Sequence, residues 1–157
     1  MAIRWFKNKV IDPVKGAVTS GLSAKNLSMS LSVGLTAGLF PIPGLTTVPT
    51  IGLSYILGAN IVVAQVVNML CFALELAMVY PFMMAGRYIL GGADFSFSLN
   101  DFELSLEALK HYARPFGYGV LAWTIMAPFM LGVVYYLLLY PAVYIVRVLT
   151  PAKNRES

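Results

Sequence analysis

Two long apolar runs constrain what this chain can fold into. Residues 61–90 and residues 116–146 are almost entirely apolar. About 20 such residues are enough for a helix to cross the roughly 30 Å hydrocarbon core of a bilayer. The whole chain is 59% apolar and 11% charged, whereas ordinary soluble domains are about 25% charged. We therefore predict an all-α integral membrane protein, a single membrane domain over residues 1–157, with transmembrane helices at 61–90 and 116–147.

Charge collects at the two ends of the chain. A basic segment at 1–26 precedes the apolar region and a basic tail at 148–157 follows it. Such flanks are typical of the cytoplasmic side of a membrane and rarely mark a nucleic-acid site. Residues 2–11 predict a short amphipathic helix on an anionic leaflet, or else a disordered basic tail. We expect both termini to be cytoplasmic at the cell membrane, the inner membrane in bacteria, with lipids and no nucleic acid as partners.

The first apolar stretch, residues 27–58, is broken in its middle. Residues 40–44 read Phe-Pro-Ile-Pro-Gly, in which two prolines remove backbone donors and glycine permits a sharp reversal. Each arm of about 14 residues would be roughly 21 Å long, too short to span a core of about 30 Å. We predict a re-entrant helical hairpin whose tip is sheltered by protein or by a watery cavity. The alternative, a full crossing, gives three spans and separates the basic ends.

The first arm of the hairpin carries a stripe of small residues. Ser30, Gly34 and Gly38 recur every four residues, which lets another helix backbone approach closely. Two full spans alone offer little shelter to a re-entrant hairpin. We therefore predict a homo-oligomer, with this stripe as one candidate contact.

Residues 93–115 form the only sizeable polar segment and predict an external loop with a short amphipathic interfacial helix that ends before Pro115. Within it, Glu103, Glu107 and His111 recur every four residues, as metal ligands on one helix face can. A solvated helix face produces the same spacing. With no second ligand group in the chain, we expect no metal and no cofactor.

The region from Leu27 to Gly91 also carries a set of motifs that point to a family. These are Ser32 to Phe40 leading into Pro41-Ile42-Pro43-Gly44, then Thr46-Thr47, Gly58-Ala59-Asn60, Asn68, and Tyr88-Ile89-Leu90-Gly91. With them the chain resembles the uncharacterised membrane family catalogued as domain of unknown function 2062. That domain can accompany glycosyltransferases that act on lipid-linked sugars, so the resemblance implies at most a lipid-facing or carrier-lipid role.

The hairpin tip is the first candidate site. Backbone N–H groups at Gly44, Leu45, Thr46 and Thr47 open the second arm, so its positive dipole end and two hydroxyls could bind an anion such as a phosphate head group. Alternatively, the tip merely turns the chain and the hydroxyls cap the helix. Arg87 is a further candidate for a phosphate, or an anchor at the membrane interface.

The second candidate is a polar face on the first long run. Gln65, Asn68 and Glu75 fall within about 80° of one another at 100° per residue. An ionisable group inside a span costs about 2.5 to 3.5 kcal/mol and usually faces the protein interior. Glu75 is therefore a candidate for proton coupling or ion binding. A protonated Glu75 that forms a hydrogen bond between subunits is the alternative.

These features favour transport over catalysis. The chain has no phosphate-binding loop and no paired intramembrane carboxylates, so we expect no enzyme. The leading hypothesis is a transporter or flippase for an anionic amphiphile, either a phospholipid or a polyprenyl-phosphate-like carrier, with the tip as anion site and Glu75 as coupling group. The alternatives are a non-transporting scaffold or partner-recruiting subunit and, more weakly, an ion channel. An open cavity that joins the tip to Glu75 would favour transport, and a dry, packed tip would favour the scaffold.

Overall fold

The structure of the chain is a computed structural model that describes residues 4, 7–19, 21–91 and 106–149. Most of these residues are helical, the rest lie in turns and short connections, and no β-strand occurs among them, which confirms the predicted all-α class. The elements in chain order are η1 (Lys7–Ile11), a short π-helical segment, followed by α2 (Asp12–Thr19), α3 (Ala24–Ala37), α4 (Thr47–Leu57), α5 (Ile61–Leu70), α6 (Phe72–Leu90) and α7 (Leu106–Leu149).

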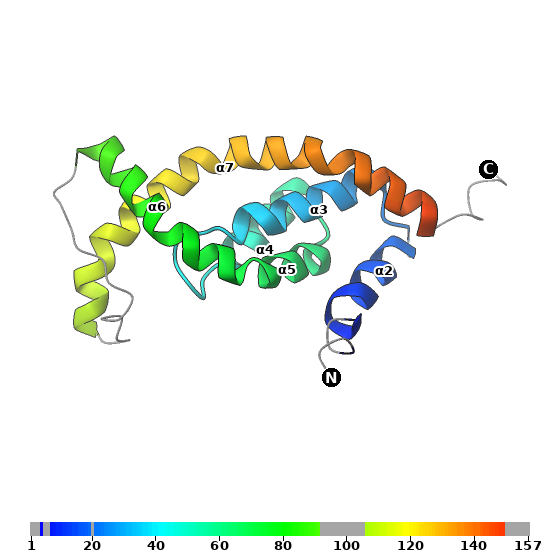
Figure 1. The fold of residues 1–157 in the computed structure, drawn as a ribbon, viewed down its shortest axis with the longest axis horizontal. Helices are drawn as coiled ribbons and strands as arrows, with labels where there is room; N and C mark the ends of the chain where they lie inside the picture. The colour runs from blue at the N-terminus through cyan, green and yellow to red at the C-terminus, as the bar shows by residue number, and fades with distance from the viewer. Residues whose placement is uncertain (1–3, 5–6, 20, 92–105, 150–157) are drawn as a thin grey trace.

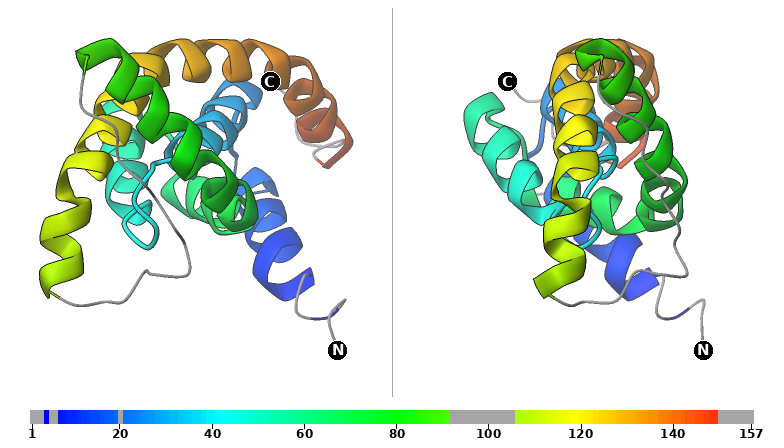
Figure 2. Two further views of the ribbon diagram at one scale, coloured as in Figure 1. Left: turned by 60° about the vertical axis from the view of Figure 1, so that its left-hand side comes forward. Right: turned by 90° about the vertical axis from the view of Figure 1, so that its left-hand side faces the viewer.

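The long helix α7 forms an arch against which α3 and α6 pack (Figures 1 and 2). Three prolines, Pro115, Pro128 and Pro141, lie inside it, and each lacks the N–H group for one helical hydrogen bond. The prediction that a short helix ends before Pro115 is wrong, because α7 continues through that residue. Pro115 is buried, and the adjacent Phe116 packs on Val79 of α6, so tertiary packing offsets the lost hydrogen bond.

Helices α3 and α4 form the two arms of a hairpin, as the broken apolar stretch predicted. Two hydrogen bonds join its open end. The Asn26 side-chain amide donates to the Gly58 carbonyl oxygen, and the Asn60 backbone N–H donates to Ser30 Oγ at 2.7 Å. The start of α3 therefore lies beside the end of α4, and the chain leaves the hairpin where it entered.

Residues 61–90 do not form the single helix that was predicted. The chain is broken at Cys71, where α5 and α6 meet at an angle of 74°, and α6 continues without interruption past Pro81. The break has a packing cause. Helix α5 follows α3 closely enough that a Cβ atom on Gly38 would lie 2.8 Å from Cys71 Cβ, whereas α6 follows α7, so the chain must change direction between them.

The small-residue stripe packs inside the chain. A Cβ atom on Gly34 would overlap the Ala64 carbonyl oxygen and would lie 2.7 Å from Val67 Cβ, so α3 and α5 are in backbone contact there. The expectation of a close helix contact at the stripe is met within one chain. The stripe is therefore no longer a candidate for contact between subunits.

The two ends of the chain's helical part lie together. Ala17 of α2 and Val146 of α7 pack on the same cluster of buried residues, which includes Leu27 at the start of α3. Figure 1 shows α2 and the last turns of α7 at one end of the long axis, and the end of α6 and the start of α7 at the other. The chain thus extends from the end that holds α2 to the opposite end along α5 and α6, and returns along α7.

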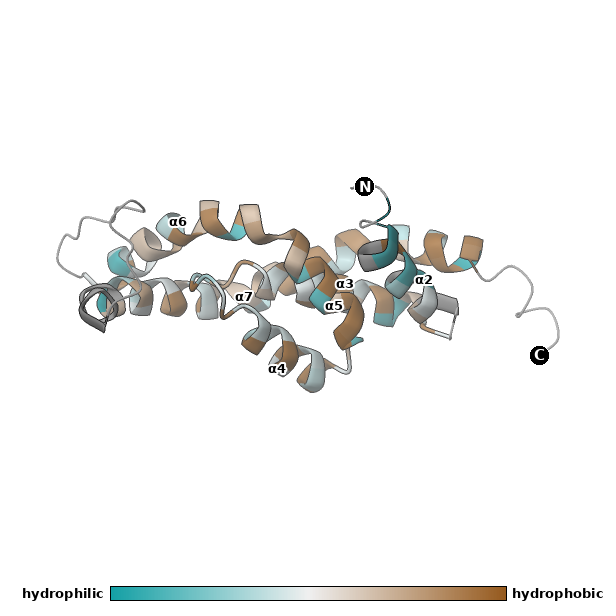
Figure 3. Ribbon diagram, turned by 90° about the horizontal axis from the view of Figure 1, so that it is seen from below, coloured by the Kyte–Doolittle hydropathy of each residue, from teal (hydrophilic) through white to brown (hydrophobic). Residues whose placement is uncertain are grey.

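Much of the apolar surface faces outward. The segment Ala113–Leu149 is long and apolar enough to cross a membrane, and α5 with α6 would provide a second crossing if this bent pair counts as one span. Only 6% of the most apolar 18-residue stretch of that segment is buried, unlike the core helix of a soluble protein. In Figure 3 hydrophilic residues are prominent in α2, brown and tan residues dominate α6, and α4 alternates hydrophobic with paler residues.

Candidate functional site

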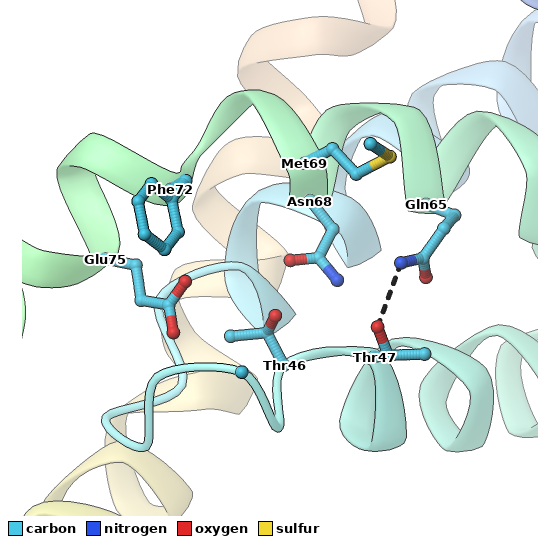
Figure 4. A pocket seen from close by; sticks show the side chains of 8 residues that line it. Thr46, Thr47, Gln65, Asn68, Met69, Phe72 and Glu75 are labelled. Atoms are coloured by element: carbon cyan, nitrogen blue, oxygen red, sulfur yellow. Dashed lines mark hydrogen bonds between the residues drawn. The ribbon is translucent and has the colours of Figure 1, made fainter.

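The hairpin tip and the polar face of α5 and α6 enclose one open cleft of about 310 Å³. Figure 4 shows the side chains of Gln65, Asn68 and Glu75 directed from these helices toward the tip loop. The structure thus brings together six of the residues that the sequence singled out separately. The cleft is lined by Gly44, Thr46, Thr47, Gln65, Asn68, Met69, Phe72 and Glu75.

The tip is held in place by the helices behind it. Pro41 is buried against α7, where a Cβ atom on Gly119 would lie 3.2 Å from the Pro41 ring. Ile42 packs on the buried pair Val79 and Met83 of α6. Gly44 then has a φ of +85°, a left-handed conformation that favours glycine. The tip is therefore packed against helices of the same chain.

The start of α4 presents the positive end of its dipole to the cleft. The hydrogen bonds that close the tip use the N–H groups of Leu45, Val48 and Thr50 and not those of Thr46 and Thr47. Thr46 is buried at 7% exposure, whereas Thr47 is exposed. Helix starts of this kind suit a negatively charged group.

Two side-chain amides connect the polar face to α4. Gln65 Nε2 donates to Thr47 Oγ1 at 3.0 Å, and Asn68 Nδ2 donates to Thr50 Oγ1 at 2.9 Å. Because both pairs are 18 residues apart in the chain, the same register of α5 against α4 satisfies both bonds. Thr50 is one residue that sequence reasoning missed, although its place one helical turn after Thr46 was a usable signal.

Glu75 lies at the far side of the cleft from α4 and is only 2% exposed. Oε1 of Glu75 and Oε1 of Gln65 are buried without a hydrogen-bond partner. A buried polar atom left unpaired costs about 1 to 3 kcal/mol. Two such oxygens at one cleft are therefore available to a ligand that donates hydrogen bonds.

The rim of the cleft is apolar. Met69 is 61% exposed and Phe72 is 56% exposed, and neither was predicted as a site residue because periodicity alone does not separate a cleft rim from a lipid-facing surface. No lysine or arginine lines the cleft. Neither Leu45, which is 49% exposed, nor Arg87, in the last turn of α6, is among the residues that line the cleft.

The remaining candidates do not add to this site. Glu103 lies outside the described residues, as do the side chains of Glu107 and His111. Among the residues that the structure describes, no group of three His, Cys, Asp or Glu side chains could hold a metal ion.

Comparison with known proteins places the chain in a family. No curated protein and no solved structure matched it. The family described as "uncharacterized protein conserved in bacteria (DUF2062)" matches residues 4–150, which extends beyond the region of the motifs to include α7. Because the match covers nearly the whole chain, this protein belongs to the DUF2062 family.

Proposed function

We propose that the protein is an integral membrane protein with two crossings, one formed by α5 and α6 and the other by α7. The exposed apolar surface of α7 and the shared position of α2 and the end of α7 support this topology. Both basic ends then lie in the cytoplasm. The α3–α4 hairpin enters and leaves on that side, because hydrogen bonds join its two ends.

Cysteine labelling tests this topology. In a Cys71→Ser background, Lys25→Cys places a cysteine at the start of the hairpin and Ala59→Cys places one just after its end. We expect both to react with a membrane-impermeant maleimide in inverted vesicles and not in intact cells. Labelling of the two positions from opposite sides would mean that the hairpin crosses the membrane, and would contradict the proposal.

We propose further that the protein binds the phosphate-bearing head group of an amphiphile in the tip cleft and moves it between the leaflets. The observation that carries this proposal is the open cleft itself, which joins the start of α4 to Glu75. Thr46 and Thr47 supply donors for a phosphate, and Met69 and Phe72 supply an apolar path for the tail. A scaffold has no need of a polar cleft with buried, unpaired acceptors.

A transport assay tests this function. In vesicles that contain the purified protein and a fluorescent phospholipid, we expect Thr47→Val and Glu75→Gln each to slow lipid exchange between leaflets at least about tenfold, the loss of one charge-assisted hydrogen bond. Thr124→Val is the matched control, because the Thr124 hydroxyl is exposed and bonds only within α7, to the Val120 carbonyl oxygen. Exchange that is absent with the wild-type protein, or equal in all variants, would favour the scaffold.

A substitution in the small-residue stripe cannot separate transporter from scaffold. Gly34→Leu would disrupt either one, because Gly34 is in backbone contact with α5 of the same chain. The cleft variants are the informative ones. Self-association stays a proposal that rests on the sequence alone.

A further inference from the structure

We propose that the head group bound in the cleft is zwitterionic. It contains a phosphate ester and a primary ammonium group, as phosphatidylethanolamine does. This inference rests on the proposed function and names its substrate class. It narrows that class from anionic amphiphiles to zwitterionic ones, and it follows from the charge and the hydrogen-bonding groups of the cleft.

The charge of the lining is the first argument. Glu75 is the only ionisable acid or base among the eight lining residues, and no lysine or arginine accompanies it. A ligand with phosphate alone would place a second negative charge near the ionised form of Glu75, whose side chain is 2% exposed. Like charges in a poorly hydrated site repel strongly, since little solvent screens them. A ligand that carries an ammonium group beside its phosphate removes this conflict.

The separation of donors and acceptors is the second argument. At the α4 side, the N–H groups of Thr46 and Thr47 are not used by the bonds that close the tip. At the other side, Oε1 of Glu75 is a buried acceptor with no partner. The unpaired Oε1 of Gln65 lies nearer Thr47, to which the Gln65 side chain donates. Figure 4 shows the Glu75 carboxyl group directed into the cleft from α6. One end of the cleft thus suits a phosphate and the other an N–H donor.

The size and the rim of the cleft are the third argument. A volume of about 310 Å³ is at the lower end of ligand pockets, which hold roughly 300 to 1,000 Å³. It is enough for a small head group and leaves no room for acyl chains. The tails would then lie outside, along the exposed Met69 and Phe72 side chains at the rim. A bulky sugar-phosphate head group fits this volume poorly.

Competitive lipid binding tests the inference. The full-length protein is incorporated into nanodiscs or detergent micelles, and native mass spectrometry measures the binding of phosphatidylethanolamine, phosphatidylcholine and phosphatidylglycerol with identical acyl chains. Phosphatidylcholine has the same charges as phosphatidylethanolamine, but its quaternary ammonium cannot donate a hydrogen bond. We expect phosphatidylethanolamine to bind about tenfold more tightly than either of the others.

Two variants assign the preference to the cleft. Glu75→Gln removes the carboxylate charge but keeps an acceptor oxygen, so it is expected to reduce the preference for phosphatidylethanolamine over phosphatidylcholine from about tenfold to about threefold. Thr47→Val is expected to weaken all three lipids and to keep their order, because they share the phosphate. The comparison of three lipids on the wild-type protein needs no variant and so holds even if Glu75→Gln fails to fold.

The outcomes separate this inference from the proposed function. Equal or tighter binding of phosphatidylglycerol would overturn the zwitterionic head group and leave an anionic amphiphile as substrate. Equal binding of phosphatidylcholine would show that the ammonium group donates no hydrogen bond. If none of the lipids binds, the proposed function fails as well.

Discussion

Replacement of Gly86 by alanine is expected to destabilise the protein by about 3 kcal/mol, the upper end of the cost of overpacking. Gly86 is a buried residue of α6 at the point where this helix crosses α7. A Cβ atom there would overlap the Tyr118 carbonyl oxygen and would lie 2.9 Å from Tyr118 Cα. Both contacts are with backbone, so no side-chain rotation can relieve them and the two helices must separate.

The measurement is the midpoint of thermal unfolding in detergent, which we expect to fall by roughly 10 °C. Gly132→Ala in α7 is the matched control, because a Cβ atom at Gly132 meets nothing within 4 Å. Inside an exposed helix this change should stabilise by about 0.5 to 1 kcal/mol. Equal midpoints for the two variants would show that α6 does not cross α7 at Gly86.

Replacement of Trp123 by alanine is expected to cost about 3 to 5 kcal/mol, the usual range for a buried aromatic residue. Trp123 is 8% exposed and its indole N–H donates to the Thr36 carbonyl oxygen of α3 at 2.9 Å. Its ring also makes an edge-to-face contact with Phe40, with ring centroids 5.1 Å apart. The residue thus joins α7 to α3 and to the start of the hairpin tip, so we also expect weaker lipid binding in the cleft.

A graded series separates packing from hydrogen bonding at this position. Trp123→Phe keeps an aromatic ring and loses the bond to Thr36, which should cost about 1 to 2 kcal/mol. Phe129→Ala in the same helix removes an aromatic ring that is 73% exposed, and is expected to change the midpoint little. If Trp123→Ala were as mild as Phe129→Ala, the α3–α7 contact described here would be wrong.

The hairpin shows which features could be predicted from the sequence and which could not. The prolines and glycine of residues 40–44 act on their own backbone, so the reversal and the two flanking helical arms could be predicted. The packing of the tip against other helices of the chain could not be predicted. The sequence suggested a second subunit, whereas the structure packs Pro41 and Ile42 against α7 and α6 of the same chain. Such contacts join residues far apart in sequence and leave no local pattern.

The same division holds for the site. Helical periodicity placed Gln65, Asn68 and Glu75 on one face, and the composition of the tip indicated a helix start with free donors. That the face and the tip form one cleft was decided by the bend at Cys71, by the contact of Gly34 with Ala64, and by the two amide bonds to α4. The sequence has no proline or glycine at Cys71 that would predict the bend.

The sequence by itself therefore determined the apolar helices, the place of the turn, and the faces that carry polar groups, because these depend on residues within a few positions of one another. The tertiary structure alone decided which face meets which, how the helix over 61–90 is divided, and that Glu75 keeps one carboxyl oxygen without a partner. Those outcomes depend on how closely two helix backbones can approach. That distance is a property of the two packed helices together and cannot be predicted from the sequence of either one alone.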